Sequence, residues 1–334
     1  MTAFHCTGWV ELDGRRLTAA EIETIIRTEP ATVRRFGGEF FLSFDVCCAR
    51  DHFGIMLGPV PRGTLVCADG NRFAIRPDPA PLPLEEAIIT AVRLRSNEGV
   101  TALSGGVDSS LVAALAGREC VAVGLEGSHD LERARHAAGL LGLTCSLVRI
   151  TPAEIEAAVP VVVAAIPRKN PVDTGIALTQ YFIARWAGEH GYRRVLTGQG
   201  ADELFGGYSR YLSTPTLEED LAKDVAGLSE QAERDQSIAA LHGTCFSMPY
   251  MDIRVVRAAG AFQAAEKVKG GCRKIPLRAV AGRHIPAELA SYEKKAMQYG
   301  TGVWGVLKKL ARKNGYTTSV QDYIDHIRGV KHGH

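Results

Sequence analysis

The stretch Leu103-Ser-Gly-Gly-Val-Asp-Ser-Ser110 decides the fold. It ends a short apolar run that begins at Val100, and it leads into a helical pattern from Ser109 to Ala116. Two glycines let the backbone come close to a ligand, and the N–H groups at the start of a helix attract anions. The stretch therefore predicts a strand, an anion-binding turn and a helix in succession.

The segments that follow alternate between strand-like and helix-like patterns. We expect helices at 84–95, 130–141 and 175–190, and strands at 100–103, 120–124, 147–150 and 194–197. Strands that alternate with helices predict a parallel, doubly wound sheet, which is an α/β fold. The remainder, from about 217 to 327, is expected to be helical.

A proline-rich connector, Asp78-Pro-Ala-Pro-Leu-Pro-Leu84, separates this region from the start of the chain. Before it, residues 39–45 read as a strand, and residues 65–74 as a hairpin around Asp69-Gly70-Asn71. We therefore expect a small β-rich domain at 1–80 and a larger domain at 84–334.

The composition suits a globular protein, with 46% hydrophobic and 23% charged residues among 334. The apolar runs are too short for a membrane span, and a secretory leader is not evident, so a cytoplasmic protein is expected. The net charge of +2 does not favour a nucleic-acid partner. The eight cysteines lack Cys-x-x-Cys spacing, so most are expected to be small buried residues rather than zinc ligands or a redox pair.

A second glycine-rich motif, Leu196-Thr-Gly-Gln-Gly-Ala-Asp-Glu-Leu-Phe-Gly-Gly-Tyr208, also follows an apolar strand. In an open parallel sheet, ligands bind beyond the carboxyl ends of the strands, so both motifs should face one pocket. Carboxylate oxygens are ligands that Mg²⁺ prefers. Asp108 and Asp202 are therefore expected to flank one magnesium ion, and the resemblance described next implies that this ion is bound to the pyrophosphate of ATP.

The first motif lacks the lysine of the common phosphate loop and resembles instead the pyrophosphate loop of ATP pyrophosphatases. Together the two motifs resemble the asparagine synthetase family, and other segments match in the same order. These segments are Val123-Gly-Leu-Glu-Gly-Ser128, Met248-Pro-Tyr-Met-Asp252 and Lys294-Lys-Ala-Met-Gln-Tyr-Gly-Thr-Gly302. The resemblance covers residues 84–310 and implies an adenine nucleotide alpha hydrolase-like fold.

The resemblance also implies roles for individual residues. Leu103 and Val123 would border adenine, Gly198 would lie near the α-phosphate, and Lys294 would stabilise charge during adenylation. The residues that would hold the phosphates are Ser104, Gly105, Gly106, Asp108, Ser109 and Ser110. Asp202 and Gln199 complete the expected catalytic set.

The N-terminal part resembles the end of the family's glutamine-hydrolysing domain, through Phe36-Gly-Gly-Glu-Phe-Phe41 and Ala49-Arg-Asp-His-Phe-Gly-Ile55. The family's nucleophile is an N-terminal cysteine exposed by removal of methionine, whereas this chain begins Met1-Thr2. Glutamine hydrolysis is therefore not expected. Ammonia is the expected amine donor, and a separate glutaminase subunit is one source for it.

Departures from the family pattern leave the substrate open. Gln199 stands where asparagine synthetases carry a glutamate associated with ammonia transfer, and an amide cannot act as a general base. Cys245 and Ser247 stand where the family has Glu and Arg, and the acidic pattern around residues 168–174 is not reproduced. By the resemblance, the expected carboxylate is either aspartate or another acid, as in the related β-lactam-forming synthetases. A tRNA-modifying ATP pyrophosphatase and a non-catalytic nucleotide-binding relic are the remaining alternatives.

Overall fold

The computed structural model describes residues 4–292 and 297–329. The described residues form two compact units. The first unit contains the chain up to Asn97 together with Gly198–Gln236 and Ser247–Val280. The second contains Glu98–Thr197, Ser237–Phe246 and the chain from Ala281. The domain division predicted from the sequence, 1–80 and 84–334, stays a prediction.

The second unit is built on a sheet whose strands lie in the order β11-β10-β7-β8-β9. The strands are β7 (Val100–Ala102), β8 (Cys120–Leu125), β9 (Cys145–Ile150), β10 (Arg194–Leu196) and β11 (Cys245–Ser247). The pairs β10–β7, β7–β8 and β8–β9 are parallel. The chain moves outward from β7 to β9 and then returns to the other side of β7, which confirms the doubly wound α/β fold.

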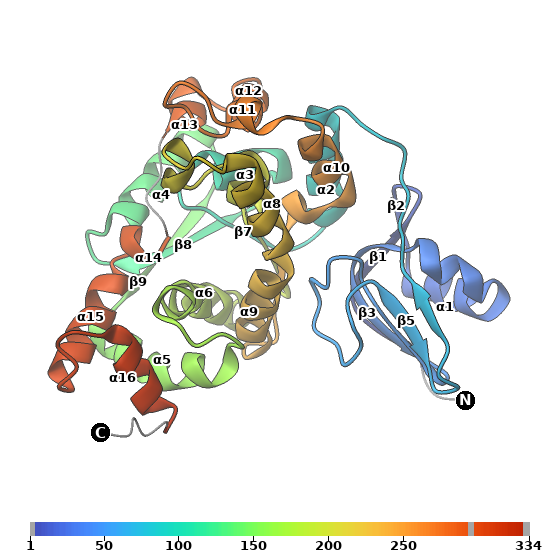
Figure 1. The fold of residues 1–334 in the computed structure, drawn as a ribbon, viewed down its shortest axis with the longest axis horizontal. Helices are drawn as coiled ribbons and strands as arrows, with labels where there is room; N and C mark the ends of the chain where they lie inside the picture. The colour runs from blue at the N-terminus through green and yellow to red at the C-terminus, as the bar shows by residue number, and fades with distance from the viewer. Residues whose placement is uncertain (1–3, 293–296, 330–334) are drawn as a thin grey trace. The chain divides into compact units, whose positions relative to one another are not determined.

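Helices cover both faces of this sheet. The helices α3 (Val107–Ala116) and α4 (His129–Leu141) pack against β7, β8 and β9, whereas α6 (Pro171–Glu189) packs against β8 and β10. Figure 1 shows α3 and α4 on one side of these strands and α6 on the other. The helix α6 starts earlier than predicted, because Asn170 caps it by accepting a hydrogen bond from the Asp173 N–H.

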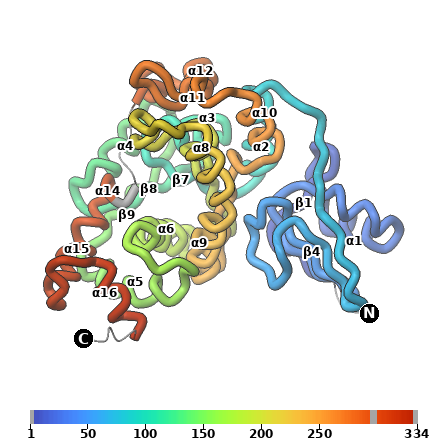
Figure 2. Tube along the Cα trace, viewed as in Figure 1, coloured from blue at the N-terminus to red at the C-terminus, as the bar shows by residue number. Residues whose placement is uncertain are grey.

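The helix α5 (Pro152–Ala165) was not predicted, because Pro160 interrupts its apolar run. A capping box between Thr151 and Glu154 fixes its start, and Pro152 occupies its first turn. The helices α15 (Val303–Lys313) and α16 (Val320–Ile327) pack against α5 and α6, as Figure 2 shows. Among the described helices, none has both the length and the apolar character that a membrane crossing requires.

The first unit begins with a six-stranded sheet in the order β2-β1-β3-β4-β5-β6. Its elements are β1 (His5–Leu12), β2 (Arg15–Arg16), α1 (Ala19–Thr28), η1 (Pro30–Arg35), β3 (Gly37–Phe44), β4 (Cys47–Arg50), β5 (Thr64–Cys67) and β6 (Arg72–Ala74). Alternate residues such as Val10, Phe40 and Leu42 point to one face and form a core with Ile22 of α1. We call this sheet the N-terminal sheet. The predicted strand at 39–45 and hairpin at 65–74 are confirmed.

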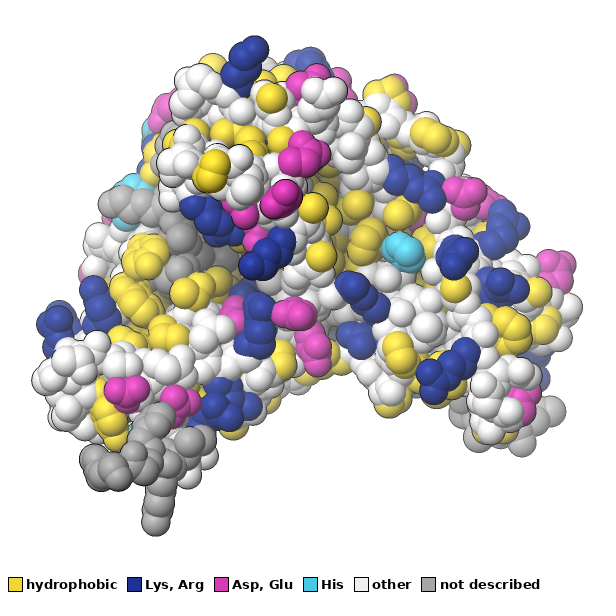
Figure 3. All heavy atoms as spheres, in the orientation of Figure 1, with side chains coloured by type: hydrophobic (Ala, Val, Ile, Leu, Met, Phe, Trp, Pro, Cys, Tyr) yellow, Lys and Arg dark blue, Asp and Glu magenta, His cyan; other side chains and the backbone are white. Residues whose placement is uncertain are grey.

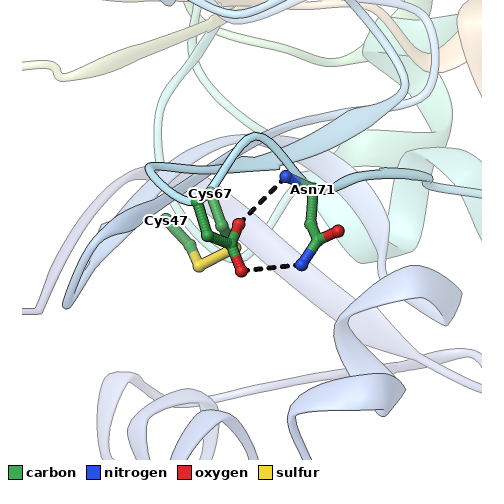
Figure 4. The surroundings of a disulfide bond; sticks show 4 residues. Cys47, Cys67 and Asn71 are labelled. Carbon is green, nitrogen blue, oxygen red and sulfur yellow. Dashed lines mark hydrogen bonds between the residues drawn. A yellow bond between two sulfur atoms is a disulfide. The ribbon is translucent and has the colours of Figure 1, made fainter.

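The expectation that most cysteines are small buried residues was wrong: all eight lie in the described part of the chain, only Cys120 is buried, and two of the others form a disulfide. Cys47 and Cys67 lie opposite each other on β4 and β5 and form a disulfide, shown in Figure 4. The hairpin beyond it turns at Gly70, where Asp69 accepts a hydrogen bond from the Asn71 N–H. The register of two strands, and not a short spacing in sequence, brings the two thiols together.

The remaining elements of the chain are mostly helical, as predicted for residues 217–327. They are α2 (Leu84–Arg95), α7 (Ala201–Phe205), η2 (Ser209–Leu212), α8 (Leu217–Ala226), α9 (Leu228–Ala240), η3 (Pro249–Met251), α10 (Ile253–Gly260), α11 (Ala264–Lys267), α12 (Ile275–Ala281), α13 (Ala287–Ser291) and α14 (Met297–Gly300). Within the first unit, α2, η3 and α10 pack against one another, and α7 packs on α10.

Candidate active site

The first loop, residues 103–110, joins β7 to α3 in the second unit. Gly105 has φ +73°, and a Cβ at this position would lie 2.7 Å from the carbonyl oxygen of Arg133. Only glycine fits such a turn. Gly106 is the N-cap of α3 and no side chain caps the helix, so N–H groups of its first turn remain for an anion.

Of the three serines of the first loop, Ser109 and Ser110 are buried and Ser104 is half-buried. Ser109 Oγ lies 2.9 Å from Ser104 Oγ and accepts a hydrogen bond from the Ser104 N–H at 3.1 Å. The hydroxyl of Ser110 has no hydrogen-bond partner among the described residues. Asp108, 7% exposed, lies in the first turn of α3, where the helix dipole favours its negative charge. The loop therefore suits phosphate oxygens and a hard cation.

Leu103 is the first residue of this loop, directly after β7, and Val123 lies within the neighbouring strand β8. Both are 3% exposed, and the Leu103 N–H donates to the carbonyl of Val121. The predicted contact of Leu103 and Val123 with adenine stays a prediction.

The second loop, residues 196–208, runs from β10 into the first unit. The short helix α7 lies between Gly200, with φ +90°, and Gly206, with φ +73°. A Cβ on Gly207 would lie 1.8 Å from Asp202 Oδ1 and 2.2 Å from Lys274 Cε. Glycine at this position is what allows the two charged side chains to meet.

Lys274 is a further candidate for the site, because it pairs with Asp202. Its Nζ lies 2.6 Å from Asp202 Oδ1, and its side chain is 9% exposed, whereas that of Asp202 is 41% exposed. The neighbouring Arg273 donates to the carbonyl of Gly207 at 2.7 Å. A buried cation therefore lies behind a half-exposed carboxylate, an arrangement that can receive both a metal ion and a polyanion. Nothing in the local sequence around Lys274 indicates this pairing.

Gln199 is held by Asp235 of α9. The Gln199 Nε2 donates to Asp235 Oδ2 at 3.0 Å, and Asp235 Oδ1 accepts from Arg234 at 2.7 Å. Arg234 and Asp235 are 2% and 1% exposed. Because a carboxylate only accepts hydrogen bonds, the Gln199 amide must turn its NH₂ group toward Asp235 and its oxygen away. A glutamate at 199 would instead face another carboxylate.

Glu203, next to Asp202, anchors the loop from inside. Burial and the charge of Asp202 raise the pKa of the Glu203 carboxyl above its usual value, although hydrogen bonds from Tyr208 and Gln231 oppose the shift. Its partners are the Tyr208 hydroxyl and Gln231 Nε2, the latter at 2.7 Å. Burial, followed by the charge of Glu203, also raises the pKa of Tyr208. This cluster fixes the shape of the loop rather than offering a reactive group.

The two loops begin side by side. The strands β7 and β10 are neighbours, and Leu196 pairs with Thr101, so the segments after Ala102 and Leu196 leave the same edge of the sheet. Asp108 belongs to the second unit and Asp202 to the first. The expectation that both carboxylates flank one magnesium ion stays a prediction, and no group of three or more His, Cys, Asp or Glu in the described part of the chain could hold a metal. Lys294 lies outside the described residues.

Comparisons with known proteins bear on this arrangement. The family model described as asparagine synthase matches residues 84–237 and 228–326. The putative glutamine-hydrolyzing asparagine synthetase 1 of Methanocaldococcus jannaschii is 31% identical, over 73% of this chain and 53% of the relative. The carboxyethyl-arginine beta-lactam-synthase of Streptomyces clavuligerus is also 31% identical, over 69% of this chain and 46% of the relative. The chain thus spans about half the length of these curated relatives.

A solved structure gives a more distant match. The NH3-dependent NAD synthetase of Campylobacter jejuni aligns with 75% of this chain and 94% of its own, at 15% identity and a TM-score of 0.32.

Proposed function

The chain belongs to the asparagine synthase family, and from this premise we propose that it uses ATP to adenylate a carboxylate and then transfers the acyl group to an amine. The observation that carries the proposal is the common origin of the two loops at the neighbouring strands β7 and β10. The crevice where the strand order reverses is the usual ligand site of such sheets.

In the first step, a carboxylate oxygen attacks the α-phosphorus of ATP, and the bond from that phosphorus to the bridging oxygen of pyrophosphate breaks. The open N–H groups of α3 and the buried serines of the first loop would hold the phosphates. Lys274, which is held by Asp202, would place its ammonium group near the leaving pyrophosphate and offset the negative charge of the pyrophosphate. Asp108 and Asp202 are the residues that would hold Mg²⁺, which would neutralise charge on the departing phosphates.

In the second step, the amine attacks the acyl carbon and AMP departs. Gln199 would accept a hydrogen bond from the amine through its amide oxygen, because Asp235 occupies the NH₂ group. An amide cannot take up the proton, so the proton must leave through another acceptor. Lys294 remains the predicted stabiliser of charge during adenylation and the loss of AMP.

The substrates are a small carboxylic acid, aspartate or a related one, and ammonia. The curated relatives named above are a glutamine-hydrolyzing enzyme and a β-lactam synthase, and each is about twice as long as the matched segment. We propose free ammonia as the donor for this chain, with a separate glutaminase subunit as its source in the cell.

The tRNA-modifying alternative is less well supported. On the face drawn in Figure 3, Lys and Arg side chains are scattered among acidic and apolar ones. Binding to tRNA through phosphates calls for clustered cations and depends strongly on salt. Salt-sensitive tRNA binding at low protein concentration would revive this alternative.

The test is release of AMP and pyrophosphate from magnesium-ATP with a panel of carboxylic acids, each with and without ammonium. Asp108→Ala serves as the inactive control. The proposal predicts that one acid supports AMP formation and that ammonium increases it. Tight ATP binding without AMP formation for any acid would favour the non-catalytic relic and contradict the proposal.

A further inference from the structure

A chain of buried charges connects the N-terminal sheet to the loop at Ser247–Asp252. Five ionised side chains alternate in sign along it, and each is at most 4% exposed. They are, in order of contact, Glu11, Arg254, Asp252, Arg95 and Glu39. Buried charges are costly unless they are paired and hydrogen-bonded, so the whole set depends on its geometry.

Glu39 of β3 joins the sheet to the loop by hydrogen bonds. Glu39 Oε1 accepts from the Met248 N–H at 2.8 Å and from Arg95 Nε at 2.7 Å. Glu39 Oε2 accepts from Trp9 Nε1 at 3.0 Å and from the Ser247 hydroxyl. Each carboxylate oxygen therefore joins one donor from the loop to one donor from elsewhere in the first unit.

The loop at Ser247–Asp252 in turn packs against the second loop of the active site. Tyr250 and Met251 are buried, and a Cβ on Gly200 would lie 3.2 Å from Met251 Cγ and 3.5 Å from Tyr250 Cβ. Asp252 caps α10, which packs on α7. Gly200 is adjacent to Gln199, and α7 carries Asp202. Because these residues are closely packed, a displacement of Met248–Asp252 would shift Gly200 and α7.

We propose that the N-terminal sheet positions the second loop of the active site, and that Glu39 is the positioning residue through which it acts. This inference rests on the proposed function for its consequence in catalysis, but the positioning itself concerns residues 200–207 and can be measured without substrate. Ser247, which stands where the family has an arginine, fits this assignment. Its hydroxyl donates to Glu39, while the neutralising cation comes from Arg95 of α2.

The experiment is hydrogen exchange of the full chain, with Glu39→Gln compared with Phe40→Ala. Phe40 is the next residue on β3, fully buried on the opposite face, so its truncation weakens the sheet core without touching the loop. The reporting amides are Leu204 and Gly207, which donate to the carbonyls of Gly200 and Asp202. We expect Glu39→Gln to speed their exchange by about tenfold or more, and Phe40→Ala to leave it within about twofold under conditions where both variants are folded.

Ser247→Ala provides a milder variant in case Glu39→Gln does not fold. It removes one loop donor to Glu39, and we expect faster exchange of the same two amides by a smaller factor. Equal exchange of Leu204 and Gly207 in wild type and both loop-linked variants would overturn the inference. Equal acceleration by Phe40→Ala would also overturn it, because the effect would then be a general loss of stability.

The catalytic consequence is measured separately with the acid that supports AMP formation. Glu39→Gln should lower kcat more than Phe40→Ala does. If no acid supports AMP formation, the proposed function fails, while the exchange result still decides whether the sheet positions the loop.

Discussion

Two aspartates of the first unit, Asp252 and Asp202, lie beside buried cations but in opposite circumstances. Asp252 is 4% exposed and bonded by Arg95, Arg254 and the Arg254 N–H. Asp202 keeps 41% of its side chain exposed and meets Lys274. The carboxylate of Asp252 is enclosed by protein donors and stabilises the fold. The carboxylate of Asp202 keeps an exposed face, which a ligand can reach.

The pKa values of the enclosed carboxylates agree with this contrast. Burial alone would raise the pKa of Asp252, but attraction to Arg95 and Arg254 outweighs it and lowers the pKa. Glu39 behaves alike, with Arg95 and the Ser247 and Met248 donors overcoming burial. Both groups therefore stabilise the fold above their ordinary pKa values of 3.8 and 4.5, and this contribution is lost as the pH falls through their lowered values.

The largest effect on the enclosed carboxylates is expected from Arg95→Met. It leaves Glu39 and Asp252 buried without their shared cation, so we expect a loss of about 3–5 kcal/mol in the free energy of unfolding. Urea denaturation measures this loss. A variant as stable as wild type would show that the buried charges are not coupled as described.

The chemical side is tested by Lys274→Met. Because Asp202 is half exposed, we expect the free energy of unfolding to fall by only about 1 kcal/mol. AMP formation should fall by about 100-fold, the usual scale for loss of an electrostatic stabiliser. Steady-state rates and urea denaturation of the same preparation check both numbers. A large loss of stability with little loss of rate would place Lys274 on the architectural side of the comparison.

Gln199→Glu tests whether the hydrogen bond between Gln199 and Asp235 stabilises the fold. The new carboxylate would face Asp235, so we expect a loss of about 2 kcal/mol in unfolding free energy near neutral pH. The double variant with Asp235→Asn restores an amide opposite a carboxylate and should recover most of the stability. Thermal unfolding of the four proteins gives the coupling, and additive effects would contradict the pairing.

Asp51 should show the smallest effect on stability, and its pKa is shifted in the opposite direction to those of Asp252 and Glu39. Burial raises its pKa from 3.8 to about 6, despite hydrogen bonds from the Met56 and Ile55 N–H groups. Its stabilising contribution is present below 3.8 and is lost as the pH rises through about 6. The stability advantage of wild type over Asp51→Asn should therefore shrink by about 1–2 kcal/mol between about pH 4 and about pH 7. A constant difference across that range would argue against the raised pKa.

The sequence predicts those features that are written in continuous stretches. The first loop, the second loop and the alternation of strands and helices are local patterns, and the structure has them where the patterns lie. Lys274 and Asp235 could not be predicted, because each meets its partner only after distant segments fold together. The strand β1 was missed because its sequence does not alternate regularly: Gly8 interrupts it, and Trp9 and Val10 are adjacent apolar residues.

The central claim is that the carboxylate is activated by adenylation, and isotope transfer tests it most directly. The carboxylic acid that supports the reaction is labelled with heavy oxygen in its carboxyl group, incubated with magnesium-ATP and ammonium, and the products are analysed by mass spectrometry. The account predicts that one labelled oxygen appears in the phosphate of AMP and none in pyrophosphate. Label in inorganic phosphate, with ADP as the nucleotide product, would show activation by an acyl phosphate and would contradict the account.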